Sequence, residues 1–159
     1  MSVVEEVAAA FVLGKASPAF RSLIGTNNGI GSQGIIIDGT PEQKTRYLPK
    51  LASGEMIASF AHTEPGAGSD AASLRTSARR DGDQFVLNGT KRYITNAPHA
   101  GLFTVFARTD PSSKNASGVT AFLVEAAVPG ICLGAVDKKM GHKGPHTCDV
   151  IFEDCRVPA

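Results

Sequence analysis

Apolar residues in the first third of the chain recur at helical spacing. Seven residues per two turns place one apolar face at i, i+3, i+4 and i+7, and this pattern predicts a helix that ends near Gly14. The residues that carry it are Val3, Val4, Val7, Ala8, Phe11 and Val12. Ser17-Pro18 then offers an N-cap followed by proline at the first helical position, which predicts a second helix. Thr40 and Gln43 fit a capping box, so a short third helix is expected from Pro41 to about Tyr47.

After Gly54 the period changes from helical to alternating, and the segments become short and rich in β-branched or aromatic residues. These predicted strands cover 57–62, 74–79, 84–87, 90–95, 102–109, 119–125 and 147–152. Asp81-Gly82-Asp83 and Asn88-Gly89 are tight-turn signals that predict successive antiparallel hairpins. The fold class expected is therefore α+β, with an N-terminal helical segment followed by an antiparallel β-barrel or sandwich domain.

Composition and charge remove several classes of function. The 159 residues include 16 Lys and Arg against 15 Asp and Glu, for a formal net charge of +1, and the basic residues are scattered. This balance gives no sequence-independent attraction for a polyanion, so a nucleic-acid partner is not expected. No apolar run approaches the roughly 18 residues of a membrane span. The three cysteines, Cys132, Cys148 and Cys155, form no CxxC pair and indicate neither a disulfide framework nor a zinc site.

The densest cluster of special residues is TEPGAGSD at 63–70, directly after the first predicted strand. Two glycines within three residues let the backbone approach a ligand, and Ser69 with nearby N–H groups suits a phosphate. Alone, the segment is equally consistent with a glycine-rich turn between strands. It is not a dinucleotide fingerprint, because no helical pattern follows it, and it lacks the lysine of a P-loop. TKRYITN at 90–96 reads by itself as an ordinary strand.

Read in order, the motifs are more specific than any of them alone. They are GTPEQK at 39–44, YLPKLASGE at 47–55, TEPGAGSD at 63–70, LNGTK at 87–91, YITN at 93–96, KMG at 139–141 and VPA at 157–159. This succession resembles the acyl-CoA dehydrogenase family of flavoenzymes from about Gly34 onward. The resemblance implies FAD as cofactor, an acyl-CoA thioester as substrate and oxidation to a trans-2-enoyl-CoA.

The resemblance also implies which residues contact the flavin. A flavin needs an apolar wall and hydrogen-bond donors along its polar edge. By matching position, the cofactor-binding residues are Phe60, Ala61, His62, Thr63, Gly68, Ser69, Tyr93, Ile94 and Thr95, with Thr63 at the pyrimidine edge and Thr95 near N5. Ser69 also lies on the substrate side. Tyr93 stands where the family has tryptophan, and His62 stands where a small or apolar residue is usual, either donating to the flavin or packing beside it.

No catalytic residue and no metal ligand is predicted in this chain. Glu64 is expected to be structural, and Gly144 and Pro145 prevent His142 and His146 from sharing a metal at helical spacing. In the family the base is a glutamate of a helical domain that follows the β-domain. We expect residues 1–55 to be the last part of an N-terminal helical domain and residues 56–159 to be the central β-domain, with the C-terminal helical domain absent and the chain inactive alone.

The family also implies partners and a compartment. They are an electron-transfer flavoprotein and further copies of the complete subunit, in the bacterial cytoplasm or, for a eukaryote, the mitochondrial matrix. The acidic start, Glu5-Glu6, offers no signal or transit peptide. Two other interpretations stay open: a fragment of a related flavin oxidase or monooxygenase, and a non-catalytic interaction module derived from the fold.

Overall fold

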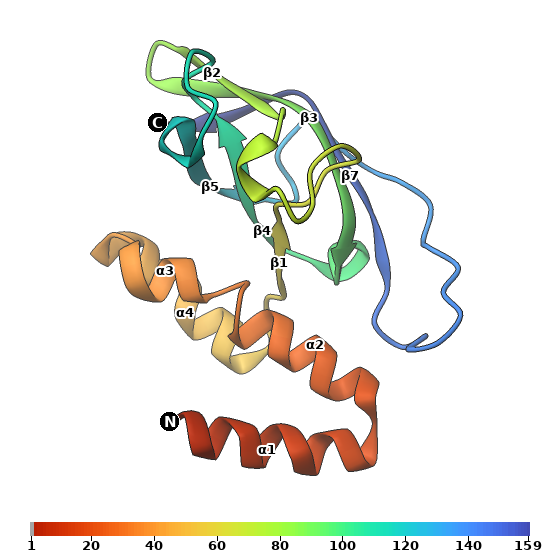
Figure 1. Cartoon of the computed structure of the whole chain (residues 1–159). Coiled ribbons are helices and arrows are strands. Elements are labelled where there is room, and N and C mark those ends of the chain that lie inside the picture. Colours follow the sequence, from red (N-terminus) through yellow and green to blue (C-terminus); the bar gives the residue numbers. More distant parts are fainter. Residues whose placement is uncertain (1) are drawn as a thin grey trace.

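Helices occupy the first third of the chain in the computed structural model, which describes residues 2–159 (Figure 1). They are α1 (Val3–Ala16), α2 (Pro18–Asn28), α3 (Gln33–Asp38) and α4 (Pro41–Ser53). The Ser17 hydroxyl accepts a hydrogen bond from the Ala19 N–H, and Pro18 begins α2, as the sequence predicts. Thr40 and Gln43 cap α4 reciprocally, with N–H donors 3.2 and 2.9 Å from the side-chain oxygens. None of these helices is long and apolar enough to cross a membrane.

Helix α4 continues past the expected end near Tyr47 and includes Pro49. A proline inside a helix removes one hydrogen bond and crowds the preceding turn. Burial of Tyr47 and Leu51 keeps the helix together, because both pack in a small apolar cluster with Ile35. Gly54, at φ +78°, ends the helix in the left-handed conformation that suits glycine.

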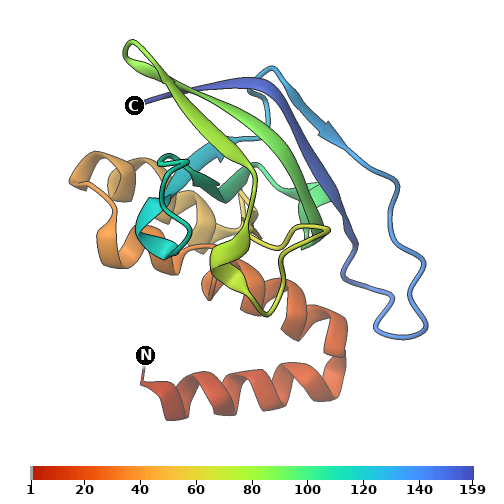
Figure 2. The ribbon, with the colours of Figure 1, turned by 45° about the horizontal axis from the view of Figure 1, so that its top comes forward.

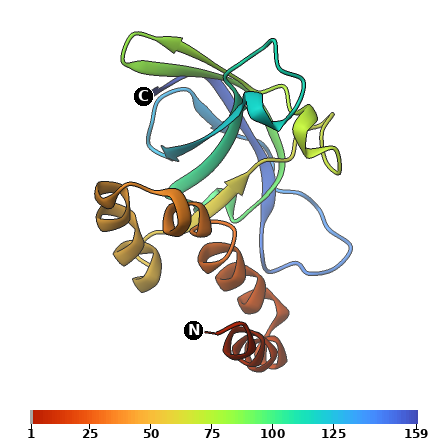
Figure 3. The same ribbon diagram turned by 60° about the vertical axis from the view of Figure 1, so that its left-hand side comes forward.

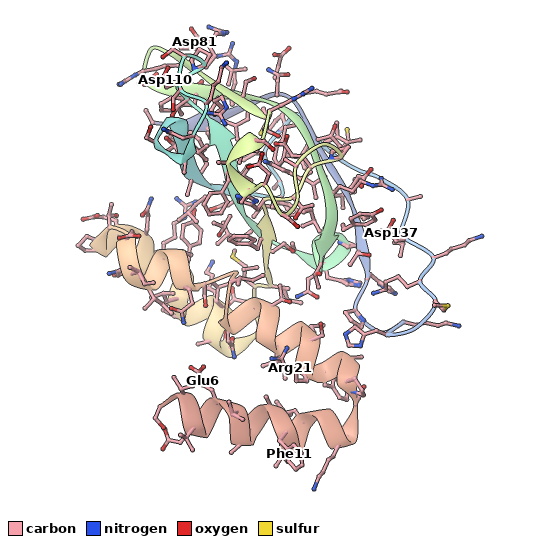
Figure 4. The ribbon with its side chains drawn as sticks, viewed as in Figure 1. Glu6, Phe11, Arg21, Asp81, Asp110 and Asp137 are labelled. Carbon is pink, nitrogen blue, oxygen red and sulfur yellow. The ribbon has the colours of Figure 1, made fainter. Side chains whose placement is uncertain are left out.

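Helix α1 has the predicted position but buries none of its residues. Its valines and Phe11 are exposed, Phe11 to 66%. Phe11 lies on the side of α1 turned away from α2, whereas Glu6 and Arg21 lie in the gap between the two helices (Figure 4). The apolar pattern therefore predicted the position of the helix correctly. The apolar side of α1, however, is not covered by any other part of residues 2–159.

The remainder of the chain forms one curled, mixed sheet (Figure 3). Its strands are β1 (Ala58–Ala61), β2 (Ser77–Asp81), β3 (Gln84–Thr95), β4 (Leu102–Arg108), β5 (Val119–Glu125), β6 (Ile131–Leu133) and β7 (Thr147–Pro158). Their order is β1-β4-β2-β3-β7-β6, with β5 also paired to β4. Short 3-10 turns, η1 (Ala71–Ser73), η2 (Ala97–His99) and η3 (Ala116–Gly118), interrupt the connections. The predicted class, helices followed by a β-domain, is confirmed, although β4 runs parallel to β1 and β2.

Two local expectations about turns have different outcomes. The hairpin at Asp81-Gly82-Asp83 is present, with Gly82 at φ +67° between β2 and β3. The second turn, at Asn88-Gly89, is wrong: the predicted strands 84–87 and 90–95 are one strand, β3, with a register shift beside Gly89. Pairing with β7 along the whole length of β3 overrides the local turn signal (Figure 2). The short strand β6 was not predicted.

The sheet curls around the main apolar core, which includes Leu87, Phe103, Val105 and Phe152. A second cluster joins the helices to the start of the sheet through Leu51, Ala58 and Leu102. Asn27 lies at this junction and is buried. Its amide donates to the Leu51 carbonyl at 2.9 Å, and its side-chain oxygen accepts from the Ala58 N–H at 2.7 Å. The helices are thereby fixed against the edge strand β1.

Candidate functional site

The two segments that carry the sequence motifs meet at the ends of β1 and β3. The Arg92 N–H donates to the Thr63 carbonyl at 2.7 Å. The Ser59 hydroxyl donates to the Thr95 carbonyl at 2.8 Å. Both bonds cross between β1, with the loop that follows it, and the last residues of β3. The structure therefore brings Thr63 and Thr95 into one region, although they are 32 positions apart in the sequence.

Alternation along β1 divides its residues between the two faces of the sheet. Phe60 and His62 lie on the outer face, where their rings are stacked with centroids 5.9 Å apart. Each ring is also 5.0 Å from the ring of Phe106 on the neighbouring strand β4. Ala61 points the other way and is fully buried in the main core. Of the predicted residues on β1, Phe60 and His62 thus offer side chains to the outer face, and Ala61 offers its backbone.

The end of β3 has an unusual backbone. Tyr93 and Asn96 adopt φ of +58° and +66°, and the register with β7 shifts between Lys91 and Ile94. A left-handed conformation costs an L-residue roughly 1–2 kcal/mol. The bulge leaves the Tyr93 side chain 59% exposed while Ile94 remains in the core. Backbone strain of this kind concentrates at functional sites, so the exposed Tyr93 ring is a candidate ligand-binding surface.

Cationic and acidic groups surround the base of that ring. The Arg92 guanidinium lies 4.6 Å from the Tyr93 ring centroid. It also forms an ion pair with Asp149 on β7 at 2.7 Å. The Tyr93 ring therefore has a cation over one face, while the residue as a whole stays largely exposed.

The loop after β1 folds back on itself through a pair of backbone hydrogen bonds between Glu64 and Ala67. Gly68 and Ser69 follow this turn and are exposed. Apart from Gly68 and its two chain neighbours, no heavy atom within residues 2–159 lies within 4 Å of a Cβ built on Gly68, so the surrounding space is open. Within residues 2–159 no hydrogen bond joins Gly68 or Ser69 to Thr63 or Thr95, so the structure does not gather these four residues into one hydrogen-bonded set.

A buried ion pair, which the sequence did not reveal, underlies the site. The Lys91 ammonium and the Glu64 carboxylate are 2.8 Å apart, with the lysine side chain fully buried. Burial lowers the pKa of Lys91, and Glu64 opposes that shift. Burial alone would raise the pKa of Glu64, but hydrogen bonds from Lys91, Thr76 and Arg75 outweigh it and the pKa is lowered. The carboxylate of Glu64 is thus stabilised in its charged form by the groups that donate to it.

His62 borders the same ion pair. Burial lowers the pKa of its imidazole, the Lys91 charge lowers it further, and Glu64 acts in the opposite direction. The ring is thus neutral at neutral pH, which suits its stacking against Phe60. A neutral imidazole can still donate one hydrogen bond, so both earlier interpretations of His62, packing and donation, are compatible with its position.

A pocket of about 240 Å³ opens on the outer face next to the ring cluster. Phe60, Thr104 and Phe106 form its sheet side, and Ile30 and Ile35 come from the helical part. Apolar walls of this kind suit a hydrocarbon or an aromatic ring. The sequence did not single out the helical residues that line it.

His142 and His146 are close together in the sequence, but in the structure the partner of His146 is a different histidine. His146 lies 3.1 Å from His99 of η2, nitrogen to nitrogen, and not beside His142. The Asn96 N–H also donates to the His146 carbonyl. The start of β7 is thereby attached to the residues directly after the Tyr93 bulge.

Comparison with known proteins places the chain in a family. Residues 1–55 match the acyl-CoA dehydrogenase N-terminal domain, and residues 59–155 match the acyl-CoA dehydrogenase middle domain. Mitochondrial isovaleryl-CoA dehydrogenase of Pongo abelii is 42% identical over 148 residues, which are 92% of this chain and 35% of the relative. The chain belongs to the acyl-CoA dehydrogenase family, as its motifs indicate.

Solved structures agree in fold. Acyl-CoA dehydrogenase from Geobacillus kaustophilus has a TM-score of 0.92 at 40% identity, covering 97% of this chain and 40% of that chain. A glutaryl-CoA dehydrogenase from Mycobacterium smegmatis in complex with FADH2 has a TM-score of 0.88 at 36% identity, covering 95% and 38%. The chain thus spans well under half the length of the relatives that it matches.

The residues present fit a flavin by their chemistry. Thr63 and Thr95 bring hydroxyl groups for which the structure gives no hydrogen bond within residues 2–159, while their carbonyls are engaged. Tyr93 presents an exposed aromatic face beside them. Donors next to an aromatic surface match the polar edge and flat ring of an isoalloxazine.

Proposed function

We propose that this chain provides one wall of the flavin and acyl-CoA sites of an FAD-dependent acyl-CoA dehydrogenase. The observation that carries the proposal is the Tyr93 bulge, which exposes a strained aromatic residue beside Thr95 and Thr63. Family membership supports the cofactor and the substrate class. Bound FAD supplies the acceptor for the hydride from the substrate β-carbon.

The roles proposed for individual residues follow from their matching positions in the family motifs. Thr63 and Thr95 donate hydrogen bonds to the polar edge and N5 region of the flavin, and Tyr93 packs against the ring. Phe60, His62 and the backbone of Ala61 line it, while Ile94 contributes from within the strand. Gly68 and Ser69 approach the pyrophosphate, and Ser69 also contacts the acyl-CoA. Hydroxyl and backbone N–H donors stabilise the negative charge that develops on a reduced flavin.

The proton from the substrate α-carbon needs a base that none of these residues supplies. Glu64 is 8% exposed, and its carboxylate accepts bonds from Lys91 and from the N–H groups of Arg75 and Thr76. A carboxylate held in this way is a poor base, because its charged form is stabilised. We therefore propose that the base comes from outside this β-domain and that the chain has no dehydrogenase activity alone.

The division of the chain and its surroundings are part of the same proposal. Residues 1–55 are the last part of a helical domain and residues 56–159 the β-domain, which the separate family matches support. An electron-transfer flavoprotein reoxidises the complete enzyme, and the complete subunit associates with its own copies. The bacterial cytoplasm or the mitochondrial matrix is the compartment.

Titration of the chain with FAD tests the proposal. We expect weak binding, seen as a change in flavin fluorescence, and no bleaching of the flavin absorbance when acyl-CoA is added. Thr63→Ala and Thr95→Ala each remove one donor and are expected to weaken binding about fivefold to tenfold. Thr120→Ala, at an exposed position on β5, is the matched control and should leave affinity unchanged.

Two results would contradict the proposal. Flavin reduction by this chain without another polypeptide would refute the assignment of the base to a different domain. Absence of FAD binding by the wild-type chain, or equal effects of Thr63→Ala and Thr120→Ala, would favour a non-catalytic interaction module.

A further inference from the structure

Lys91 is a fully buried charge at the centre of the candidate site. Its ammonium group donates to three oxygens: the Glu64 carboxylate at 2.8 Å, the His62 carbonyl at 3.2 Å and the Phe106 carbonyl at 2.6 Å. An ammonium has three N–H donors, and each has an acceptor here. The side chain of one residue on β3 therefore reaches the end of β1, the loop that follows β1 and strand β4.

The partner carboxylate extends the network to a fourth segment. Glu64 accepts from the backbone N–H of Arg75 at 2.6 Å and of Thr76 at 2.9 Å, just before β2. These residues share no local sequence motif, because the bonds of the network join positions up to 29 residues apart in the chain. The Lys91 side chain is fully buried and the Glu64 side chain is 6% exposed, so water competes little for the two charges.

The position of the network relative to Thr63 gives it a role beyond packing. Lys91 holds the carbonyl of His62 and the side chain of Glu64, which are the two neighbours of Thr63 in the chain. The next residue, Arg92, donates its N–H to the Thr63 carbonyl. Both chain neighbours of Thr63 are thus bonded to Lys91, and Thr63 itself is bonded to Arg92. Lys91 and Arg92 are the two residues of β3 directly before Tyr93.

Stability alone is a weak explanation for such a pair. Burying two charges has a desolvation cost that is often as large as their attraction, and apolar side chains of similar volume frequently serve stability as well. What the charges add is geometric specificity. The three hydrogen bonds of the ammonium are satisfied together only when the segments that carry the acceptors keep this relative placement.

We propose that Lys91, acting through Glu64 and the His62 carbonyl, is the positioning residue that sets the placement of Thr63 against the Tyr93–Thr95 segment. The proposal rests on the proposed function where it concerns flavin, since Thr63 and Thr95 are the donors assigned to that cofactor. Lys91 itself does not touch the ligand.

The test replaces both charges and compares the variant with a destabilised core of the same fold. Lys91→Met with Glu64→Gln keeps similar volumes and leaves no buried charge. Val157→Ala removes apolar contacts on β7, where its partner is Phe85 and not Lys91, and leaves the network intact. The first measurement is amide hydrogen exchange of the Arg92 N–H, with the Phe103 and Val105 amides as reporters of global unfolding. The second is the dissociation constant for FAD at a temperature where both variants are folded.

In the charge-free variant we expect the Arg92 amide to exchange at least about tenfold faster relative to the core amides, and FAD to bind about tenfold more weakly. In Val157→Ala the Arg92 and core amides should accelerate together, and the FAD affinity of the folded protein should be unchanged. If the double variant does not fold, Glu64→Gln alone is measured in the same way. Arg92 exchange that stays in step with the core amides would overturn the proposal.

The exchange measurement separates this proposal from the proposed function. If the wild-type chain fails to bind FAD, the proposed function fails, and the Arg92 amide still decides whether the ion pair positions the Thr63 segment. If FAD binds and its affinity is the same in the charge-free variant, the proposed function stands and the positioning role is refuted.

Discussion

Tyr93 combines three properties that rarely coincide in one residue. It lies in a strand, it has a positive φ, and its aromatic ring is largely exposed. Only the motif at 93–96 marked it in the sequence, since nothing in the local composition predicts a left-handed tyrosine. The neighbouring Ile94 fills the core, and the bulge is what allows one residue to face outward and the next inward.

Substitutions at Tyr93 should reverse the usual order of stability. In an ordinary strand, glycine is less stable than alanine by roughly 0.5–1 kcal/mol. At φ +58° we expect Tyr93→Gly to be about 1 kcal/mol more stable than Tyr93→Ala, because glycine alone adopts this backbone without strain. Urea denaturation measures the difference. Equal FAD affinities of wild type and these two variants would contradict the contact proposed for the ring.

The free energy of unfolding should decrease as the pH decreases, because His62 takes up a proton more readily in the unfolded chain. The pKa of His62 is lowered in the folded chain, so the unfolded chain binds the proton at a higher pH than the folded chain does. The contribution to the free energy of unfolding is complete above the ordinary histidine range and is lost as the pH falls through that range toward the lowered value.

Denaturation between pH 7.5 and 5 measures this slope, and His62→Gln should flatten it. His142→Gln, at an exposed position in the loop before β7, is the comparison and should leave the slope close to that of the wild type. A slope unaffected by His62→Gln would show that other groups carry the pH dependence.

At the scale of elements, the sequence predicted what local chemistry decides. The caps at Ser17 and Thr40 and the hairpin at Gly82 follow from side chains or φ values within four residues. Asn88-Gly89 carries an equally strong turn signal, yet β3 continues because β7 pairs with it on both sides of the bulge. A partner strand more than fifty residues away leaves no trace in the local pattern.

Position 89 requires glycine because of a tertiary contact with Thr76, and a substitution can test this requirement. A Cβ there would lie 2.7 Å from the Thr76 Cα at φ +148°, so neither the backbone nor the neighbour accommodates it. We expect Gly89→Ala to destabilise the chain by about 3 kcal/mol or more, from overpacking and backbone strain together. Gly82→Ala, at φ +67° in open space, should cost about 1–2 kcal/mol. Similar losses in thermal denaturation would contradict this account.

The candidate site was predictable in part for the same reason. Thr63, Tyr93 and Thr95 stand in motifs that are visible without a structure. Lys91 was not identifiable, because a lysine in a strand is ordinarily exposed and only the tertiary approach of Glu64 makes its burial tolerable. The pocket beside Phe60 likewise needs residues from the helices that no pattern linked to the sheet.

At the scale of the whole molecule, few polar contacts join the helices to the sheet. Asn27 bridges α2, the end of α4 and β1, and Tyr47 and Arg46 on α4 bond to Glu125 on β5. The Thr104 hydroxyl on β4 also donates to the Gly31 carbonyl at 3.2 Å, and the Asn96 amide donates to the Leu23 carbonyl at 3.3 Å. The Glu125 contacts are largely at the surface, whereas both Asn27 contacts are buried and join α4 to β1 through one side chain.

Removing this connection should loosen the helices before the sheet. Asn27→Ala leaves the Ala58 N–H and the Leu51 carbonyl buried without partners, at a cost of about 2–3 kcal/mol. We expect proteolysis within residues 1–55 to accelerate while the β-domain stays protected. Asn28→Ala, the exposed neighbour, is the control and should change proteolysis little. Equal acceleration in both parts would indicate a single cooperative unit.

The pairing of β3 with β7 has a consequence for the order of events during synthesis. Residues 84–95 receive their longest partner strand only when residues 147–158 have been made. At roughly 5–20 residues per second, β3 leaves the ribosome several seconds before β7 does. During that interval one edge of a twelve-residue strand is open to pairing with other nascent chains. The bulge at Gly89 and the charges at Lys91 and Arg92 interrupt that edge, and irregularity and charge of this kind disfavour pairing between chains. The features that shape the proposed flavin-binding surface are therefore also expected to protect the growing chain from misassembly.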